Sequence, residues 1–226
     1  MKFFINNIAP ITLLKGEEVN HIKNVLRKSI GDEIIICDGK NTDYLCRIEN
    51  LGKKEIALKI IKSYPTETES HLDLTLYQGL LKSPKQEMVI QKAVELGVGK
   101  ITFMETERSV AKAAENKLTR WEKIAKTAAM QSERGIIPAI DFTDFAQALE
   151  DFASTKILAY EKAEQRDFGN ITDTVALYIG PEGGFSQREI DKAAEKNIRT
   201  LSLGKSILRS ETAAIAACSI VFYLGS

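Results

Sequence analysis

The sequence predicts an α/β protein with a small all-β N-terminal domain and a larger domain built on a mostly parallel sheet. Short β-type runs separated by turns fill the first 61 residues, and strand and helix patterns alternate after residue 71. A polar, proline-containing segment, residues 63–70, separates the two and is expected to be a linker. Alternating strands and helices are typical of a parallel sheet with helices on both faces. We therefore expect domains at residues 1–70 and 71–226.

The N-terminal pattern predicts a small β-barrel with one short helix. Residues 33–37 form an apolar run followed by Asp38-Gly39, a strong signal for a β-hairpin. Residues 44–48 and 56–61 are further expected strands, and residues 19–27 are the expected helix. A β-domain of this size is only marginally stable alone.

The second domain is expected to alternate strands with helices. The expected strands are residues 72–77, 101–104, 157–160, 175–179 and 199–203, and the expected helices include residues 86–97, 118–133 and 213–224. Thr143 is expected to cap a further helix that carries Phe145 and Phe152. Ser186 and Glu189 have the spacing of a capping box, which opens another helix. The last helix is apolar on nearly all faces, which is typical of a helix covered on more than one side.

Composition excludes several classes of protein. Thirty-one basic and 31 acidic side chains give a formal net charge of zero, so RNA binding would need a local basic patch. Two histidines and three cysteines (Cys37, Cys46 and Cys218) do not have metal-site spacing, so we expect no metal and reduced thiols in a cytoplasmic protein. The N-terminus lacks a signal-peptide pattern. The twelve-residue apolar stretch 213–224 is shorter than the ~20 residues of a membrane span, so no membrane partner is expected.

Three unusual loops follow predicted strands, where ligands bind in open α/β sheets. They begin at Tyr160-Glu161, at Gly180 and at Gly204. The glycine-rich loop after residue 179 could bind a ligand, or it could be a tight strand-to-helix connection. The sequence contains neither a dinucleotide-binding motif nor a P-loop motif. Ser210 or Thr212 could cap the last helix. Arg209, however, is a cation at the unfavourable end of a helix, so we expect it to face an anion.

These loops resemble a known family. Ile179-Gly-Pro-Glu-Gly-Gly-Phe-Ser186 and Leu201-Ser-Leu-Gly-Lys-Ser-Ile-Leu-Arg-Ser-Glu-Thr-Ala-Ala214 are similar to two signature loops of the uridine-N3 methyltransferases of small-subunit ribosomal RNA. That family belongs to the SPOUT class of S-adenosylmethionine enzymes. Further similar segments follow in the family's order: His21–Arg27 with Gly31-Asp32, Gln78, Lys82, Gln91–Val98, Arg108-Ser109, and Gln131–Arg134 with Pro138.

The resemblance implies a PUA-like RNA-binding barrel, a C-terminal trefoil knot and a homodimer with the last helix at its interface. It implies methylation of N3 of a uridine in 16S ribosomal RNA, within helix 44 of the 30S decoding region. S-adenosylmethionine would be held in a pocket that a side chain at Gly204 should fill. The expected cofactor-binding residues are Tyr160, Glu161, Gly180, Pro181, Glu182, Gly183, Leu203, Gly204, Ile207, Leu208, Thr212 and Ala213.

Arg209 is the expected catalytic cation, and Glu211 the expected second catalytic residue, although either Glu211 or Glu182 could be the base. Basic residues in loops suggest phosphate contacts. The candidates for RNA binding are Arg27, Lys82, Lys85, Arg108 and Arg134. The alternative functions are another SPOUT activity, on transfer RNA or on a ribose 2′-hydroxyl, and a non-catalytic RNA-binding assembly factor.

Overall fold

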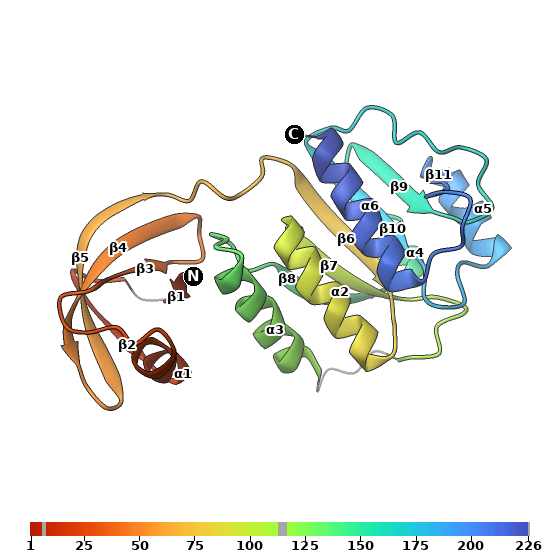
Figure 1. Ribbon diagram of the computed structural model, residues 1–226. Coiled ribbons are helices and arrows are strands. Elements are labelled where there is room, and N and C mark those ends of the chain that lie inside the picture. Colours follow the sequence, from red (N-terminus) through yellow and green to blue (C-terminus); the bar gives the residue numbers. More distant parts are fainter. Residues whose placement is uncertain (6–7, 113–116, 226) are drawn as a thin grey trace. The chain divides into compact units, whose positions relative to one another are not determined.

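A computed structural model describes residues 1–5, 8–112 and 117–225 (Figure 1). The chain forms two compact units. The first unit comprises residues 1–69 together with residues 129–137, and the second comprises residues 70–128 and everything from residue 138 onward. The helix that contains residue 128 therefore begins in the second unit and ends in residues that belong to the first unit.

The first unit is a curled five-stranded sheet with one helical segment. Its strands are β1 (Phe3–Phe4), β2 (Ile11–Lys15), β3 (Glu33–Cys37), β4 (Thr42–Leu51) and β5 (Glu55–Pro65), in the order β1-β3-β4-β5-β2. Helix α1 (Glu17–Asn20) continues into the π-helical turn η1 (His21–Val25). The predicted hairpin after Cys37 is confirmed, since β3 and β4 pair antiparallel. Apolar side chains of alternate strand positions, among them Phe3, Ile36 and Ile48, form the core.

The predicted linker begins later than expected. Strand β5 continues through Pro65 because β4 is long enough to pair with it as far as Thr42. Residues 63–65 are therefore part of the sheet, although their polar character resembles that of a loop. A proline is tolerated at this last position of the strand, where its missing N–H does not interrupt the ladder.

The second unit contains a six-stranded sheet in which every pair is parallel. Its strands are β6 (Asp73–Gly79), β7 (Lys100–Glu105), β8 (Ala139–Asp144), β9 (Thr155–Ala159), β10 (Thr174–Ile179) and β11 (Arg199–Leu201), in the order β11-β9-β10-β6-β7-β8. The predicted parallel sheet is confirmed. Strand β10 is buried from Val175 to Ile179, which explains its continuous apolar run.

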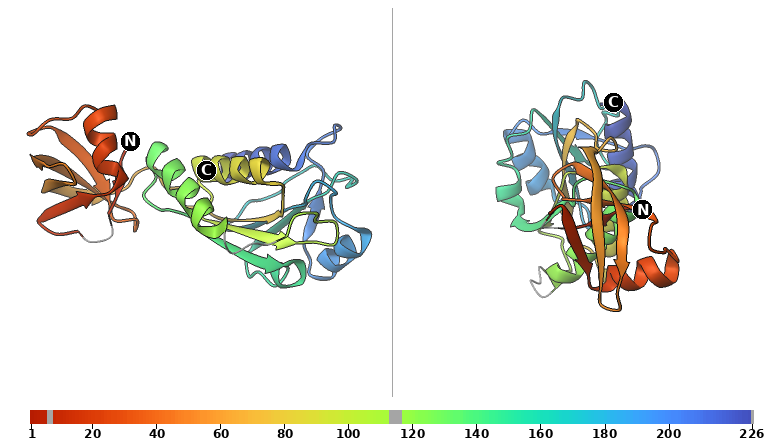
Figure 2. Two further views of the ribbon diagram at one scale, coloured as in Figure 1. Left: turned by 90° about the horizontal axis from the view of Figure 1, so that it is seen from below. Right: turned by 90° about the vertical axis from the view of Figure 1, so that its left-hand side faces the viewer.

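Helices cover both faces of this sheet. Helices α2 (Ser83–Leu96) and α6 (Ser210–Leu224) lie side by side on one face, and α5 (Gln187–Glu195) lies on the other (Figure 2, left). The short helix α4 (Phe145–Ala148) packs with α5 against Leu158 and Tyr178. Helix α3 spans Leu118–Gln131. The predicted capping box is confirmed: Ser186 Oγ accepts from Glu189 N, and the Glu189 carboxylate accepts from Ser186 N.

Two sequence predictions about helix starts are wrong. Asp144, not Thr143, caps α4, and its carboxylate accepts a hydrogen bond from Gln147 N at 2.8 Å. The preceding residues form strand β8, which the sequence pattern does not predict, so α4 is a single turn and Phe152 is fully exposed beyond it. Helix α6 has Arg209 as its N-cap and no side-chain cap. Ser210 Oγ instead donates to the carbonyl of Gly180.

Candidate functional site

The loops that follow β9, β10 and β11 surround one cavity of about 300 Å³ at the carboxyl edge of the parallel sheet. Because these three strands are neighbours, the loops come together although they lie far apart in sequence. The first turn of α6 closes one side. The lining comprises residues 159–161, residues 179–185, Ser202, Leu203, residues 206–210, Ala213, and Lys85 from α2.

Most of the predicted cofactor-binding residues line this cavity. They are Tyr160, Glu161, Gly180, Pro181, Glu182, Gly183, Leu203, Ile207, Leu208 and Ala213. Gly204 and Thr212 are not part of the lining. A Cβ atom at Gly204 would have no atom within 4 Å, so a side chain there would meet open space. Gly204 has a φ of +149°, a backbone conformation that residues with a side chain rarely adopt. This conformation explains the glycine at this position of the loop.

The carboxyl end of β6 supports the glycine-rich loop directly. A Cβ atom at Gly79 would lie 2.4 Å from the backbone nitrogen of Pro181, which only a glycine avoids. Gln78, the residue before it, is fully buried and donates a hydrogen bond to Ser210 Oγ at 2.9 Å. The roles of these two residues are not visible in the sequence, because their partners are more than 100 positions away.

Two predicted catalytic residues occupy different environments. Arg209 lines the cavity, is exposed, and has no hydrogen-bond or ion-pair partner for its guanidinium within the described part of the chain. Glu211 is buried outside the lining. Its Oε2 lies 3.8 Å from Lys85 Nζ, and the same ammonium group lies 3.4 Å from Glu182 Oε1. Lys85, predicted as an RNA contact, thus stands between two carboxylates beside the cavity.

The loop after β7 is fixed to the rim of the cavity. Arg108 Nη1 donates to the carbonyl of Gly183 at 3.0 Å. The buried carboxylate of Glu189 accepts from Glu107 N at 2.9 Å while its other oxygen accepts from Ser186 N at 2.8 Å. One carboxylate therefore joins this loop to the start of α5. Arg108, another predicted RNA contact, is exposed at this rim.

The remaining predicted RNA-binding residues do not gather at the cavity. Lys82 is exposed at the start of α2, and Arg27 is exposed in the first unit just after η1. Arg134 is only 3% exposed. Its guanidinium pairs with Glu69 at 2.7 Å, and the same carboxylate accepts from Gly135 N and Ile136 N. This network holds residues 134–136 within the first unit, so Arg134 serves the fold in this structure.

Replacing Arg134 with alanine should therefore lower the stability of the protein. The side chains of this pair are 4% and 10% exposed, so the change leaves a carboxylate buried without its cation. Loss of one partner of such a pair costs about 3 kcal/mol in the free energy of unfolding, measurable by urea titration. Arg27→Ala, at an exposed position, is the control and should change stability by less than about 0.5 kcal/mol. Unchanged stability with weakened RNA binding in Arg134→Ala would contradict the structural role.

Metal and thiol chemistry receive no support from the described residues. Over residues 1–5, 8–112 and 117–225, no group of three or more His, Cys, Asp or Glu side chains could hold a metal ion. The three cysteines are buried and unpaired with one another. Burial raises the pKa of Cys46 to about 11 and that of Cys218 to about 12, which keeps both as thiols at neutral pH. None of the described helices is long and apolar enough to cross a membrane.

The fold and the cavity together define a class of protein: a parallel α/β domain with a small-molecule cavity formed by loops, joined to a small β-sheet domain. Family comparison gives the particular family. A model described as an RNA methyltransferase domain matches residues 68–222, and one described as an RNA methyltransferase PUA domain matches residues 14–61. The chain belongs to this family of RNA methyltransferases, which confirms the resemblance found in its loops.

Individual relatives match over nearly the whole chain. Ribosomal RNA small subunit methyltransferase E of Mesomycoplasma hyopneumoniae is 36% identical, over 95% of this chain and 95% of that protein. The protein of the same name from Bacillus subtilis is 32% identical, over 95% and 91%. A crystal structure of ribosomal RNA small subunit methyltransferase E from Neisseria gonorrhoeae bound to S-adenosyl methionine has a TM-score of 0.91 at 31% identity, covering 99% of this chain and 97% of that one.

Proposed function

We propose that this protein transfers a methyl group from S-adenosylmethionine to N3 of a uridine in 16S ribosomal RNA of the 30S subunit, in helix 44 of the decoding region, in the cytoplasm. The observation that carries the proposal is a cavity in which Arg209, whose guanidinium has no partner among the described residues, stands beside loops that can hold a small molecule. Structural relatives from Neisseria gonorrhoeae and Legionella pneumophila contain bound S-adenosylmethionine.

The residues around the cavity fit this cofactor. Its volume of about 300 Å³ is within the usual range for small-molecule sites. Ile179, Leu203 and Leu208 offer an apolar surface for an adenine ring, and the glycine-rich loop brings backbone groups close. Glu161 and Glu182 have the charge that suits a cationic ligand. When bound, S-adenosylmethionine supplies an activated methyl group on a positively charged sulfur. We also propose that these loops form the trefoil knot of the SPOUT class.

The chain's own contribution is to make N3 a nucleophile and to align it. N3 of uracil carries a weakly acidic imide proton, and negative charge spreads to the ring oxygens when the proton leaves. In this proposal Arg209 stabilises that charge; in support, its guanidinium adjoins the cavity and has no partner in the described part of the chain. Holding N3 in line with the methyl group supplies the rest of the rate enhancement. The pairing edge of the base must be exposed, so we expect local unstacking of the target uridine.

Glu182 is our candidate for the base that removes the N3 proton. It lines the cavity with Arg209, whereas the carboxylate of Glu211 is buried outside the lining; Lys85 lies within 4 Å of both carboxylates. The kcat of Glu182→Gln should therefore be at least about tenfold below that of Glu211→Gln, in single-turnover assays with unmodified 30S subunits. A larger loss of kcat in Glu211→Gln would indicate that Glu211 is the base. Equal, small losses of kcat would indicate that both carboxylates serve in binding.

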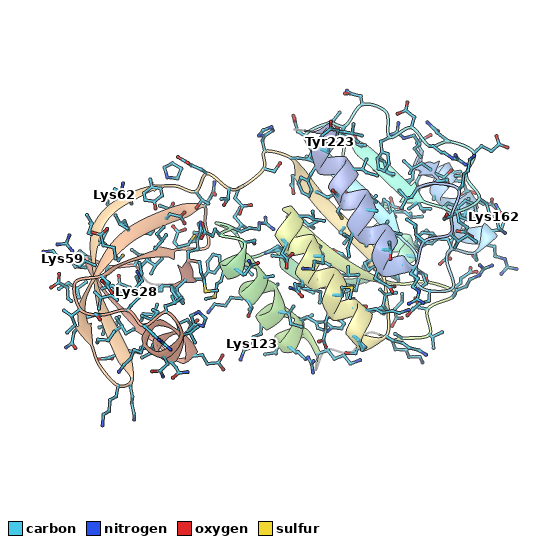
Figure 3. The ribbon with its side chains drawn as sticks, in the orientation of Figure 1. Lys28, Lys59, Lys62, Lys123, Lys162 and Tyr223 are labelled. Atoms are coloured by element: carbon cyan, nitrogen blue, oxygen red, sulfur yellow. The ribbon has the colours of Figure 1, made fainter. Side chains whose placement is uncertain are left out.

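RNA binding would use the first unit and the loops near the cavity. Lys28, Lys59 and Lys62 lie on the first unit (Figure 3), and Arg27 is exposed beside Lys28. Lys82 and Arg108 are exposed near the cavity. Their distribution fits contacts with phosphates, which position an RNA without reading its sequence.

We further propose a homodimer that covers α6 and α2. Tyr223 and Leu224 at the end of α6 are 81% and 47% exposed, and Figure 3 shows Tyr223 at that end. Met88 of α2 is also exposed and lines an apolar groove with Ile124 and Ile215. Apolar surface of this kind marks interaction sites.

Light scattering should give twice the 25.1 kDa mass of the chain. Ile215→Glu should reduce the mass to that of one chain, because a carboxylate would be buried in the interface. Lys162→Glu, on the exposed loop after β9, is the control and should remain a dimer. A wild-type mass of 25.1 kDa at concentrations that support activity would contradict the dimer.

The overall proposal is tested by methyl transfer to purified RNA substrates. Unmodified 30S subunits should accept labelled methyl groups, whereas bulk transfer RNA should not. Calorimetry should show binding of S-adenosylhomocysteine. Absence of both binding and transfer would favour a non-catalytic assembly factor, and transfer to transfer RNA alone would favour another SPOUT activity.

A further inference from the structure

A buried amide on β6 joins three segments that are remote in sequence. Gln78 is fully buried, and its Nε2 donates to Ser210 Oγ and to the carbonyl of Gly79, each at 2.9 Å. Ser210 Oγ in turn donates to the carbonyl of Gly180. The end of β6, the loop after β10 and the start of α6 are therefore linked through two side chains. Neither partner of the link touches solvent to any large extent.

This link fixes the start of α6. The helix has no side-chain cap, so no capping hydrogen bond orients its first turn. Ser210 is the first helical residue and directly follows Arg209, whose φ of −65° and ψ of 152° turn the chain into the helix. The Arg209 carbonyl accepts from Ala213 N at 2.8 Å, so the three residues of this turn that line the cavity, Arg209, Ser210 and Ala213, belong to one hydrogen-bonded turn.

We propose that Gln78 is a positioning residue for methyl transfer, acting through Ser210 to hold Arg209 toward the cavity. The inference rests on the proposed function, because it needs Arg209 to act on the RNA substrate. Gln78 does not line the cavity. Its amide can donate to the Ser210 hydroxyl while that hydroxyl donates to Gly180, an arrangement that an apolar side chain of equal length cannot make.

A merely structural role for Gln78 makes a different prediction. A buried hydrogen-bond network that only stabilises the fold would lower activity by the same factor whether or not Arg209 is present, since independent effects add in free energy. A positioning role predicts that the effects of Gln78 and Arg209 substitutions on activity are coupled. Once the Arg209 side chain is removed, a displaced backbone at residue 209 no longer moves a catalytic group, so activity falls little further. Small displacements of a catalytic group can lower rates strongly, so the effect should be measurable.

The test is a double-mutant cycle on methyl transfer to RNA. Gln78→Met and Ser210→Ala should each lower kcat on the order of 10-fold in the wild-type background and less than about twofold in Arg209→Ala. Ser210→Thr keeps the hydroxyl and should retain most of the kcat that Ser210→Ala loses. Gln86→Met is the matched control, because Gln86 is also fully buried, but its amide oxygen accepts a hydrogen bond from Leu81 N and not from the start of α6. Its effect should be the same in both backgrounds.

Hydrogen exchange provides a second readout that needs no activity. Gln78→Met and Ser210→Ala should speed amide exchange at residues 210–214, whereas Gln86→Met should speed it near residues 81–86. Equal losses of kcat in both backgrounds, or unchanged exchange at residues 210–214, would overturn the positioning role. Transfer of the methyl group to an atom other than N3 would overturn the proposed target while leaving the cycle readable, so the two failures are distinguishable.

Discussion

Arg209→Ala should lower kcat for methylation of 30S subunits on the order of 10²-fold, with little change in the affinity for S-adenosylhomocysteine. Arg209 is the N-cap of α6, where the helix dipole disfavours a cation by about 0.3–1 kcal/mol. No carboxylate within the described residues forms an ion pair with this guanidinium. Its position is explained if the guanidinium meets negative charge that develops on the uracil during the reaction.

Three outcomes separate the possible roles of Arg209. A fall in kcat supports stabilisation of the transition state. A raised KM with a weaker salt dependence would instead indicate a phosphate contact. Wild-type kcat and KM would show that neither role is correct. Lys205→Ala is the matched control, because Lys205 is an exposed cation of the same loop that does not line the cavity.

Ala213→Trp should abolish detectable binding of S-adenosylhomocysteine, a loss of at least about 100-fold in affinity. Ala213 lines the cavity from the first turn of α6, and an indole ring there would occupy the space that the ligand needs. Calorimetry and circular dichroism together show whether binding is lost in a folded protein. Lys192→Trp, at an exposed position of α5 that does not line the cavity, should bind normally. Unchanged affinity in folded Ala213→Trp would place the cofactor elsewhere.

The fold was predictable where local chemistry and tertiary structure agree. The apolar run of β10, the hairpin signal at Asp38-Gly39 and the capping box of Ser186 with Glu189 all have the structures that their patterns indicate. Strand β8 was missed because it is an edge strand with only part of its length buried. The polar positions of β8 resemble a loop, because the sequence alone does not show the neighbouring strand with which β8 pairs.

The cavity was predictable as a meeting of three loops, because the carboxyl ends of parallel strands share one edge of the sheet. The roles of single residues were less accessible. Ser210 has the chemistry of a helix cap, but its hydroxyl is engaged by Gln78 and Gly180. Arg134 is basic and lies in a loop, yet its side chain is buried in an ion pair with Glu69. Both outcomes depend on partners at least 30 positions away, which spacing along the chain does not reveal.

The most direct test of the proposed activity is the chemical position of the transferred methyl group. Unmodified 30S subunits are incubated with the protein and S-adenosylmethionine, and the 16S ribosomal RNA is then digested to nucleosides and analysed by mass spectrometry. We expect 3-methyluridine, from a single site, that is absent when Arg209→Ala replaces the wild type over the same short reaction time. A methyl group on a ribose 2′-hydroxyl, on another base, or on no nucleoside of 16S ribosomal RNA would contradict the proposed function.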